Sequence, residues 1–265
     1  MKGNLEKFIG YFLTVLLLPL QMVGNIPLSG FNEPSGIVFH SQLKTLFVVG
    51  DEGDICEIYP DGTLIKQKRI RNADFEGITY NPSTGLLYIA IEGEEKILEV
   101  DPDNFEILRE FTIERTFNGK TVLKSGGNGI EGITFVPDKH HPEGGTFYVA
   151  NQSFDLTDME DPSAIFEIEV PLKSNSAVNS TAKIIRSFFP GIIDISGLCY
   201  DESSGYLYAI SDMTDTLFKM TKDGEILKVY NLPGINQEGI TIDTEGFLYI
   251  AQDSGGVIKI KWNRH

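Results

Sequence analysis

The sequence predicts an all-β protein, a five-bladed β-propeller made of four-stranded antiparallel blades. A short motif recurs five times, each copy is followed by further strand-like segments, and no long helical period interrupts them. The copies of the motif are PSGIVF at 34–39, FEGITY at 75–80, IEGITF at 130–135, ISGLCY at 195–200 and QEGITI at 237–242.

Each motif is expected to form the first strand of one repeat. The second strands are predicted in KTLFVVGDE, GLLYIAIEG, GTFYVANQS, GYLYAISDM and GFLYIAQDS. Third strands follow these, and four of the repeats also have a fourth. Asp-Gly, Pro-Asp and Gly turns between alternating apolar residues indicate hairpins. Repeated four-stranded units of about 40–50 residues are typical of propeller blades.

The two ends of the repeat region complement each other. The fifth repeat ends at Trp262 without a fourth strand, and Asn25 to Phe31 (NIPLSGF) is a spare strand before the first repeat. We therefore expect the N-terminal strand to close the ring and remove an exposed sheet edge. Residues 25–265 then form a single propeller domain. Six blades are the alternative if the segment 136–194 hides another blade, but it contains only one motif of this type.

Residues 1–24 are predicted to be a signal peptide or an N-terminal membrane anchor. The run Phe8 to Val23 is uncharged and follows Lys2 and Lys7, the order of a positive region and an apolar region in targeting segments. Gly24 would suit a cleavage site, but Met22 is large, and the run is somewhat short for a membrane span. Cleavage of this segment and its retention as a membrane anchor are both compatible with the sequence, and each predicts an exported protein of the cell envelope.

The charge balance excludes a nucleic-acid partner. The chain has 38 acidic against 22 basic side chains, a formal charge of -16 and a pI near 4.6, whereas nucleic-acid binding needs a basic surface. Cys56 and Cys199 fall in different repeats and are expected to be small buried residues without a disulfide bond. His40, His140 and His141 are expected in exposed turns between first and second strands.

Acidic residues recur at three positions of the repeat. The residue before each motif glycine is Ser35, Glu76, Glu131, Ser196 or Glu238. Two positions earlier stand Glu33, Asp74, Gly129, Asp194 and Asn236, and the second strands end at Asp51, Glu92, Gln152, Asp212 and Asp253. Because the first two strands of a blade are antiparallel, these positions meet at one mouth of the central channel.

So many carboxylates repel one another unless a cation neutralises them. Oxygen ligands without histidine favour Ca²⁺, with Mg²⁺ less favoured. Glu76, Glu131 and Glu238 are the first candidates for metal ligands. Further residues expected at the channel mouth are Ser35, Ser196, Asp51, Glu92, Asp74 and Asp194. In the alternative interpretation these acidic groups cap loops by accepting backbone hydrogen bonds.

Two insertions, 114–128 and 153–163, are expected to overhang the same mouth. Long loops in a compact domain often serve a site.

The recurring EGIT motifs, the LYIA-type second strands and the apolar N-terminal segment resemble the SdiA-regulated, or YjiK-like, family of exported bacterial propellers. The resemblance covers roughly residues 25–262. It implies a propeller in the cell envelope, often behind a single membrane anchor, and suggests Ca²⁺ in the channel, here on Glu76, Glu131 and Glu238.

Three functions are compatible with this pattern. The first is an exported Ca²⁺-binding propeller that recognises a small molecule or an envelope protein at its acidic mouth. The second is a metal-assisted hydrolase of lactones or phosphoesters, in which Asp212 or Asp253 acts as the base. The third is a metal-free protein-interaction module that binds through its loops.

Overall fold

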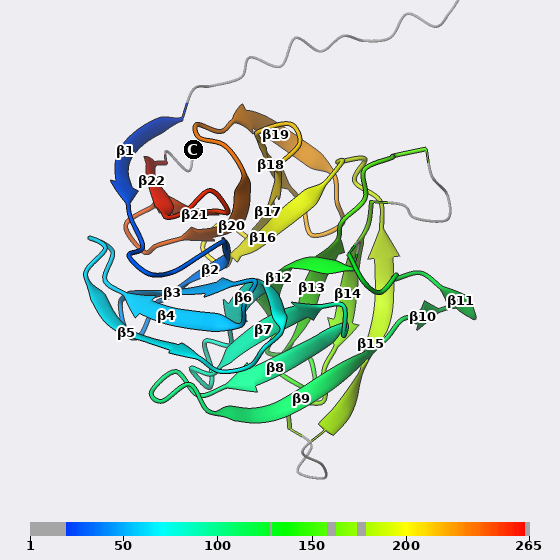
Figure 1. Cartoon of the computed structure of the whole chain (residues 1–265). Coiled ribbons are helices and arrows are strands. Elements are labelled where there is room, and N and C mark those ends of the chain that lie inside the picture. Colours follow the sequence, from blue (N-terminus) through cyan, green and yellow to red (C-terminus); the bar gives the residue numbers. More distant parts are fainter. Residues whose placement is uncertain (1–19, 128, 158–162, 174–178, 263–265) are drawn as a thin grey trace, which may run out of the picture.

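The computed structural model describes residues 20–262, except 128, 158–162 and 174–178. All regular secondary structure in this part of the chain is β-strand, arranged as a ring of small sheets (Figure 1). The predicted all-β propeller is therefore confirmed. The described part of the chain contains no helix with the length and apolarity of a membrane span.

Apart from the short strands β10 (Thr116–Phe117) and β11 (Lys120–Thr121), the described strands fall into five groups of four, each antiparallel and ordered from the channel outward. The first three groups are β2 (Pro34–His40), β3 (Thr45–Gly50), β4 (Asp54–Ile58) and β5 (Leu64–Arg69); β6 (Asp74–Tyr80), β7 (Leu87–Glu92), β8 (Lys96–Val100) and β9 (Ile107–Glu114); β12 (Ile130–Pro137), β13 (Gly145–Asn151), β14 (Ile165–Glu169) and β15 (Asn179–Phe188). The last two are β16 (Ile195–Asp201), β17 (Tyr206–Ser211), β18 (Thr216–Met220) and β19 (Ile226–Asn231); β20 (Gln237–Ile242), β21 (Phe247–Gln252), β22 (Val257–Lys261) and β1 (Gln21–Ile26). We call these groups the first to the fifth blade.

The second strand of each blade is covered on both faces, which explains its continuous apolar sequence. Phe47, Ile89, Val149, Ala209 and Ile250 are each 0% exposed. The outer strands are polar because only one face is covered; β5 reads LIKQKR and is largely exposed. The apolar clusters of the core lie between neighbouring blades.

The motif glycines let the inner strands approach one another around the axis. A Cβ on Gly197 would lie 2.2 Å from the carbonyl oxygen of Glu238, and one on Gly239 would lie 2.5 Å from the backbone nitrogen of Ile37. Gly36, Gly77 and Gly132 meet the next inner strand in the same way. The five glycines thus form a continuous ring, which no larger residue at these positions fits.

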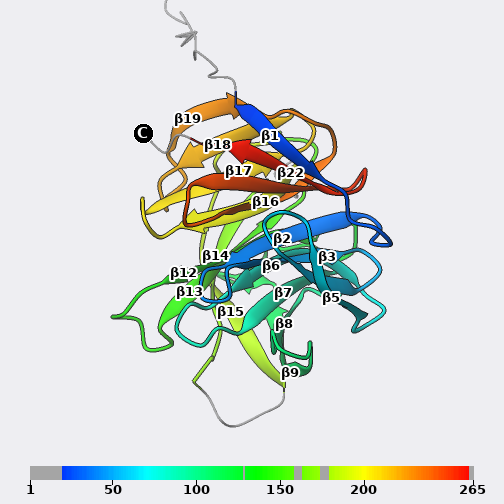
Figure 2. The same ribbon diagram turned by 90° about the vertical axis from the view of Figure 1, so that its left-hand side faces the viewer.

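The N-terminal strand is the outer strand of the last blade. β1 pairs antiparallel with β22, with Ile26 opposite Val257 and Gln21 opposite Lys261 (Figures 1 and 2). This strand begins at Gln21, four residues before the segment predicted from the sequence. The end of the predicted apolar run therefore belongs to β1, and its residues 8–19 lie outside the described residues. A cleavage after Gly24 would remove most of β1.

The segment 138–194 supplies β13, β14 and β15 of the third blade. β15 is long and pairs in parallel with β9, which joins the second and third blades into one eight-stranded sheet. The insertion before β12 forms a two-stranded hairpin of β10 (Thr116–Phe117) and β11 (Lys120–Thr121). This hairpin lies at the periphery beside β15, not over the channel as predicted (Figure 1).

The three histidines that were expected in exposed turns differ in their burial. His140 is exposed, whereas His141 is half-buried and lies 3.2 Å from a carboxylate oxygen of Glu169. His40 is buried, contrary to the prediction, because its ring contacts Tyr80 and its Nε2 bonds the carbonyl oxygen of Gly85 at 2.9 Å. His40 therefore connects the first and second blades.

Candidate functional site

The residue before each motif glycine lies at an irregularity of the inner strand. In all five blades the pairing between the first and second strands shifts register at this point. Such a bulge leaves one residue outside the ladder of backbone hydrogen bonds and redirects its side chain. The residues at these bulges are Ser35, Glu76, Glu131, Ser196 and Glu238.

Three carboxylates from two neighbouring blades form the most compact acidic group. Asp51 follows β3 in the first blade, whereas Asp74 and Glu76 lie on β6 of the second blade. One carboxylate oxygen from each lies within 4.8 Å of the other two. None of the three side chains is fully exposed. Among the described residues, this is the one group of three or more potential ligands that is compact enough to surround a single ion.

The carboxylates of this group raise one another's pKa values. Burial raises the pKa of Glu76 well above its ordinary value, and the charges of Glu131, Asp51 and Asp74 raise it further. Burial also raises the pKa of Asp51 to about 6, against a hydrogen bond that Ser35 donates to it. Every charge that acts strongly on these two groups is another carboxylate, so the site favours a positive partner.

Glu131 and Glu238 lie on the same mouth but outside the compact group. Glu131 is 5% exposed, and burial together with the charges of Glu92 and Glu238 raises its pKa well above the ordinary value. Burial raises the pKa of Glu238 to about 9, with contributions from Asp212 and Asp194. The predicted convergence of the acidic positions is thus observed, although the tightest set differs from the predicted trio.

Several other acidic residues of the mouth hold backbone groups. Glu92 accepts a 2.9 Å hydrogen bond from the N–H of Gly129, and Asp212 accepts one of 2.8 Å from Gln237. Both bonds connect a blade to the segment that begins the next one. Asp194 accepts a 2.9 Å bond from the N–H of Met213. For these three carboxylates the structure supports the capping interpretation.

The serines at the bulges also make specific contacts. Ser196 donates to the carbonyl oxygen of Gln237 at 2.8 Å, so it fastens the fourth blade to the fifth. Ser35 instead donates to Asp51 and therefore belongs to the surroundings of the compact group.

The two candidate bases, Asp212 and Asp253, differ in their hydrogen bonds. Asp212 has one oxygen bound to the N–H of Gln237. Asp253 follows β21, and its backbone N–H donates to the carbonyl oxygen of Asn236 at 3.0 Å. Its charge contributes to the raised pKa values of Asp51 and Glu238, so it lies near both.

The described ends of the two insertions contact acidic residues of the mouth. Gly129, which directly follows the first insertion, donates its N–H to Glu92, and a Cβ there would meet a carboxylate oxygen of Glu95 at 2.4 Å. Ser153, at the start of the second insertion, accepts a 2.8 Å bond from the N–H of Asp194. The end of that insertion, which includes residues 158–162, lies outside the described residues.

Sequence reasoning ranked Asp51 and Asp74 below the three glutamates. A signal in the sequence is the serine at position 35, where two of the next three blades have a glutamate, since Ser35 donates a hydrogen bond to Asp51 beside Asp74 and Glu76. Comparing the same position in the five repeats does not show this grouping, because Asp51 and Glu76 occupy different positions of the repeat and lie in different blades.

Solved structures share this fold at low sequence identity. Glutaminyl cyclase from Myxococcus xanthus matches with a TM-score of 0.63 and 12% identity over 92% of this chain and 97% of that chain. A gluconolactonase from Xanthomonas campestris matches with a TM-score of 0.54 and 14% identity over 94% and 96%. Streptogramin B lyase matches with a TM-score of 0.50 and 13% identity over 91% and 97%.

These likenesses show that the propeller is common to proteins of different activities, so the fold alone assigns no reaction. The family comparison reaches further, since the model for the SdiA-regulated family matches residues 23–254. The match includes all five motifs and the acidic mouth. The chain belongs to the SdiA-regulated family.

Proposed function

We propose that this protein binds Ca²⁺ at the acidic mouth of its channel and recognises a ligand or partner there. The observation that carries the proposal is the separation of at most 4.8 Å between oxygens of Asp51, Asp74 and Glu76. Calcium binds oxygens at about 2.3–2.6 Å, so ligands on opposite sides of the ion lie about 5 Å apart. The three carboxylates fit that requirement.

The surroundings favour calcium over magnesium. Magnesium needs six ligands in near-ideal octahedral geometry at about 2.0–2.1 Å, whereas calcium tolerates irregular sites with six to eight oxygens. The compact group takes one carboxylate from the first blade and two from the second. Three carboxylates also leave coordination positions for water or for an oxygen of a bound ligand, which is how the ion would contribute to recognition.

Thermal unfolding tests the metal site. A ligand that binds only the folded state raises its melting temperature, by about 5–10 °C for a chain of this size at about a hundredfold excess over the dissociation constant. After chelation, we expect added Ca²⁺ to raise the melting temperature of the protein and of the control Glu106→Gln, an exposed glutamate on the second blade. Asp74→Asn should lose most of the rise.

A second variant distinguishes the two candidate sets of ligands. Glu238→Gln lies outside the compact group, so it should keep the response to Ca²⁺ if Asp51, Asp74 and Glu76 hold the ion. Loss of the response in Glu238→Gln but not in Asp74→Asn would assign the ion to the glutamate trio. No response in the unmodified protein would sink the metal site.

A lactone hydrolase is the second candidate. One solved structure of similar fold is a gluconolactonase, and Asp253 lies near the compact group, since its charge helps to raise the pKa of Asp51. A bound metal ion would polarise the lactone carbonyl, and Asp253 would accept a proton from water. Calcium-dependent lactone hydrolysis that Asp253→Asn abolishes would favour this candidate over recognition alone.

We also propose that the protein is exported to the cell envelope, on the basis of the apolar run that follows Lys2 and Lys7. Fractionation of cells that express the full chain tests this location. Recovery of the protein in the cytosol at its full mass would contradict it.

A further inference from the structure

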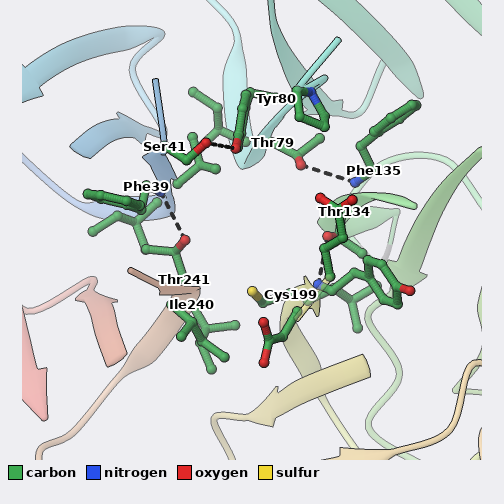
Figure 3. Close-up of a pocket in the computed structure, with 18 of the residues that line it drawn as sticks. Phe39, Ser41, Thr79, Tyr80, Thr134, Phe135, Cys199, Ile240 and Thr241 are labelled. Atoms are coloured by element: carbon green, nitrogen blue, oxygen red, sulfur yellow. Dashed lines mark hydrogen bonds between the residues drawn. The ribbon is translucent and has the colours of Figure 1, made fainter. Parts of the chain in front are cut away.

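A pocket of about 430 Å³ opens at the end of the channel opposite the carboxylate mouth (Figure 3). It is lined by residues that follow the motif glycine in every blade, whereas the acidic mouth is formed by residues that precede it. Its volume is within the range of small-molecule sites. Neither the proposed metal site nor the family match assigns anything to it.

The two ends of the channel are separated. At the level of the glycine ring, the remaining cavity is about 10 Å³. It is lined by the motif glycines, by the isoleucine or leucine that follows each of them, and by Glu76 and Ser196. That volume holds at most about one water molecule. The constriction is therefore too narrow for an organic ligand to pass from the pocket to the acidic mouth, and Asp51, Asp74 and Glu76 do not line the pocket.

The deep wall of the pocket is apolar. Its five inner-strand residues are Ile37, Ile78, Ile133, Leu198 and Ile240. The next layer contains Thr79, Thr134 and Thr241, whose hydroxyl oxygens each accept a backbone N–H of the following blade. This end of the pocket suits an aliphatic or aromatic group.

The outer wall is aromatic. Phe39, Tyr80, Phe135 and Tyr200 occupy equivalent positions in four blades and line the pocket. The labelled side chains surround an open centre (Figure 3). Phe39 already has a cation near its ring, since the Lys44 ammonium lies 6.0 Å from the ring centre. Aromatic faces attract ammonium groups, particularly where water is partly excluded.

The rim adds negative charge. Asp201, Glu202 and Asp243 are the acidic side chains that line the pocket in the described part of the chain, with no lysine, arginine or histidine among the lining residues. Glu202 is exposed, whereas Asp201 and Asp243 are buried and accept hydrogen bonds from their own turns. Glu202 and Asp201 also raise the pKa of Tyr200, after the effect of its burial, so both lie close to that ring. A cation above Tyr200 would interact with the ring and with the exposed carboxylate of Glu202, and the buried Asp201 would add to the negative potential there.

We infer that this pocket binds a small amphiphilic cation, a ligand with an apolar body and an ammonium head. The body would contact the isoleucine and leucine wall, and the head would lie among the aromatic rings and the rim carboxylates. The negative rim disfavours an anionic ligand with the same body.

Cys199 provides a local reporter of occupancy. It lines the pocket and is partly exposed. Cys56 is the other cysteine of the chain; it is 1% exposed, and burial raises its pKa to about 12. Because alkylation requires an accessible thiolate, Cys199 should react with N-ethylmaleimide far faster than Cys56, and Cys199→Ala should remove the fast reaction.

The test compares three probes with the same alkyl body: hexyltrimethylammonium, hexanol and hexyl sulfate. Alkylation of the full chain is followed by mass spectrometry in the presence of a chelator, which makes the result independent of any metal site. We expect the ammonium probe to bind about fivefold more tightly than hexanol. Hexyl sulfate should protect Cys199 least. Added salt should reduce the difference in protection between the ammonium and the sulfate probe, because it screens their charges.

A matched pair of variants locates the charge effect. Glu202→Gln should reduce the preference for the ammonium probe. Glu225→Gln should not, because Glu225 is an exposed residue in a turn at the same end of the fourth blade and does not line the pocket. Equal protection by the three probes, no protection by any, or an equal effect of the two variants would overturn the inference.

Discussion

The backbone N–H of Phe39 donates a 2.9 Å hydrogen bond to the hydroxyl oxygen of Thr241, 202 residues away. This bond joins the first blade to the last and lies beside the pocket (Figure 3). Thr79 and Thr134 accept the equivalent bonds from Phe135 and Tyr200, at 3.0 and 2.9 Å. The threonine of the EGIT motif thus fastens neighbouring inner strands together.

Replacing Thr241 by valine should destabilise the closed ring. The change keeps the shape of the side chain but leaves the buried N–H of Phe39 without its acceptor, which costs about 1–3 kcal/mol of unfolding free energy. Urea unfolding measures the loss. Thr241→Ser keeps the hydroxyl and should lose less, so an equal loss in the two variants would show that the methyl group, and not the hydrogen bond, matters.

Gly197→Ala should lower the unfolding free energy by about 3 kcal/mol, because the added Cβ would meet the Glu238 carbonyl oxygen at 2.2 Å and force two inner strands apart. Gly127→Ala is the matched control, since a Cβ there meets no atom within 4 Å. Chemical denaturation compares both with the unmodified chain. A Gly197→Ala protein as stable as the control would contradict the close packing of the glycine ring.

The metal-free protein should become less stable as the pH rises. The pKa of Glu238 is about 9 in the folded state, against an ordinary value of 4.5. The folded state therefore binds this proton more tightly than the unfolded state does. The resulting stabilisation is fully present below pH 4.5 and is lost as the pH rises through about 9. Thermal unfolding in a chelator, followed across this window, measures the slope.

Glu238→Gln should flatten that slope and raise the melting temperature at the alkaline end, because it removes a buried negative charge. Glu106→Gln, on the exposed surface, should leave the profile unchanged. A profile that Glu238→Gln leaves as steep as before would show that other groups cause the dependence.

Removing the N-terminal strand should open the last blade. A chain that starts at Pro27 lacks β1, including the buried Ile26, and exposes the edge of β22. We expect a lower melting temperature and self-association through that edge, measured by calorimetry and sedimentation. A chain that starts at Leu20 is the control. A monomeric protein of unchanged melting temperature after the longer truncation would contradict a closing role for β1.

The sequence by itself determined the class of fold, the strand repeat and the N-terminal closure. Those features depend on short-range sequence patterns. Each repeat has its own alternation of apolar residues and its own turns, and the motif glycines mark the inner strands. It also identified the acidic positions that meet at one mouth, because position within a repeat decides the end of the channel at which a side chain lies.

Only the tertiary structure decided which of those positions form a group. Asp51 comes from one blade and Asp74 and Glu76 from the next, and their separation depends on the bulges and on how closely the glycine ring draws the strands together. The burial of His40 depends in the same way on a neighbouring blade. The pocket around Thr79, Thr134 and Thr241 could not be predicted from the sequence either. Apolar residues in a repeat are expected in the core, and only the structure shows that the five inner strands leave a space between them.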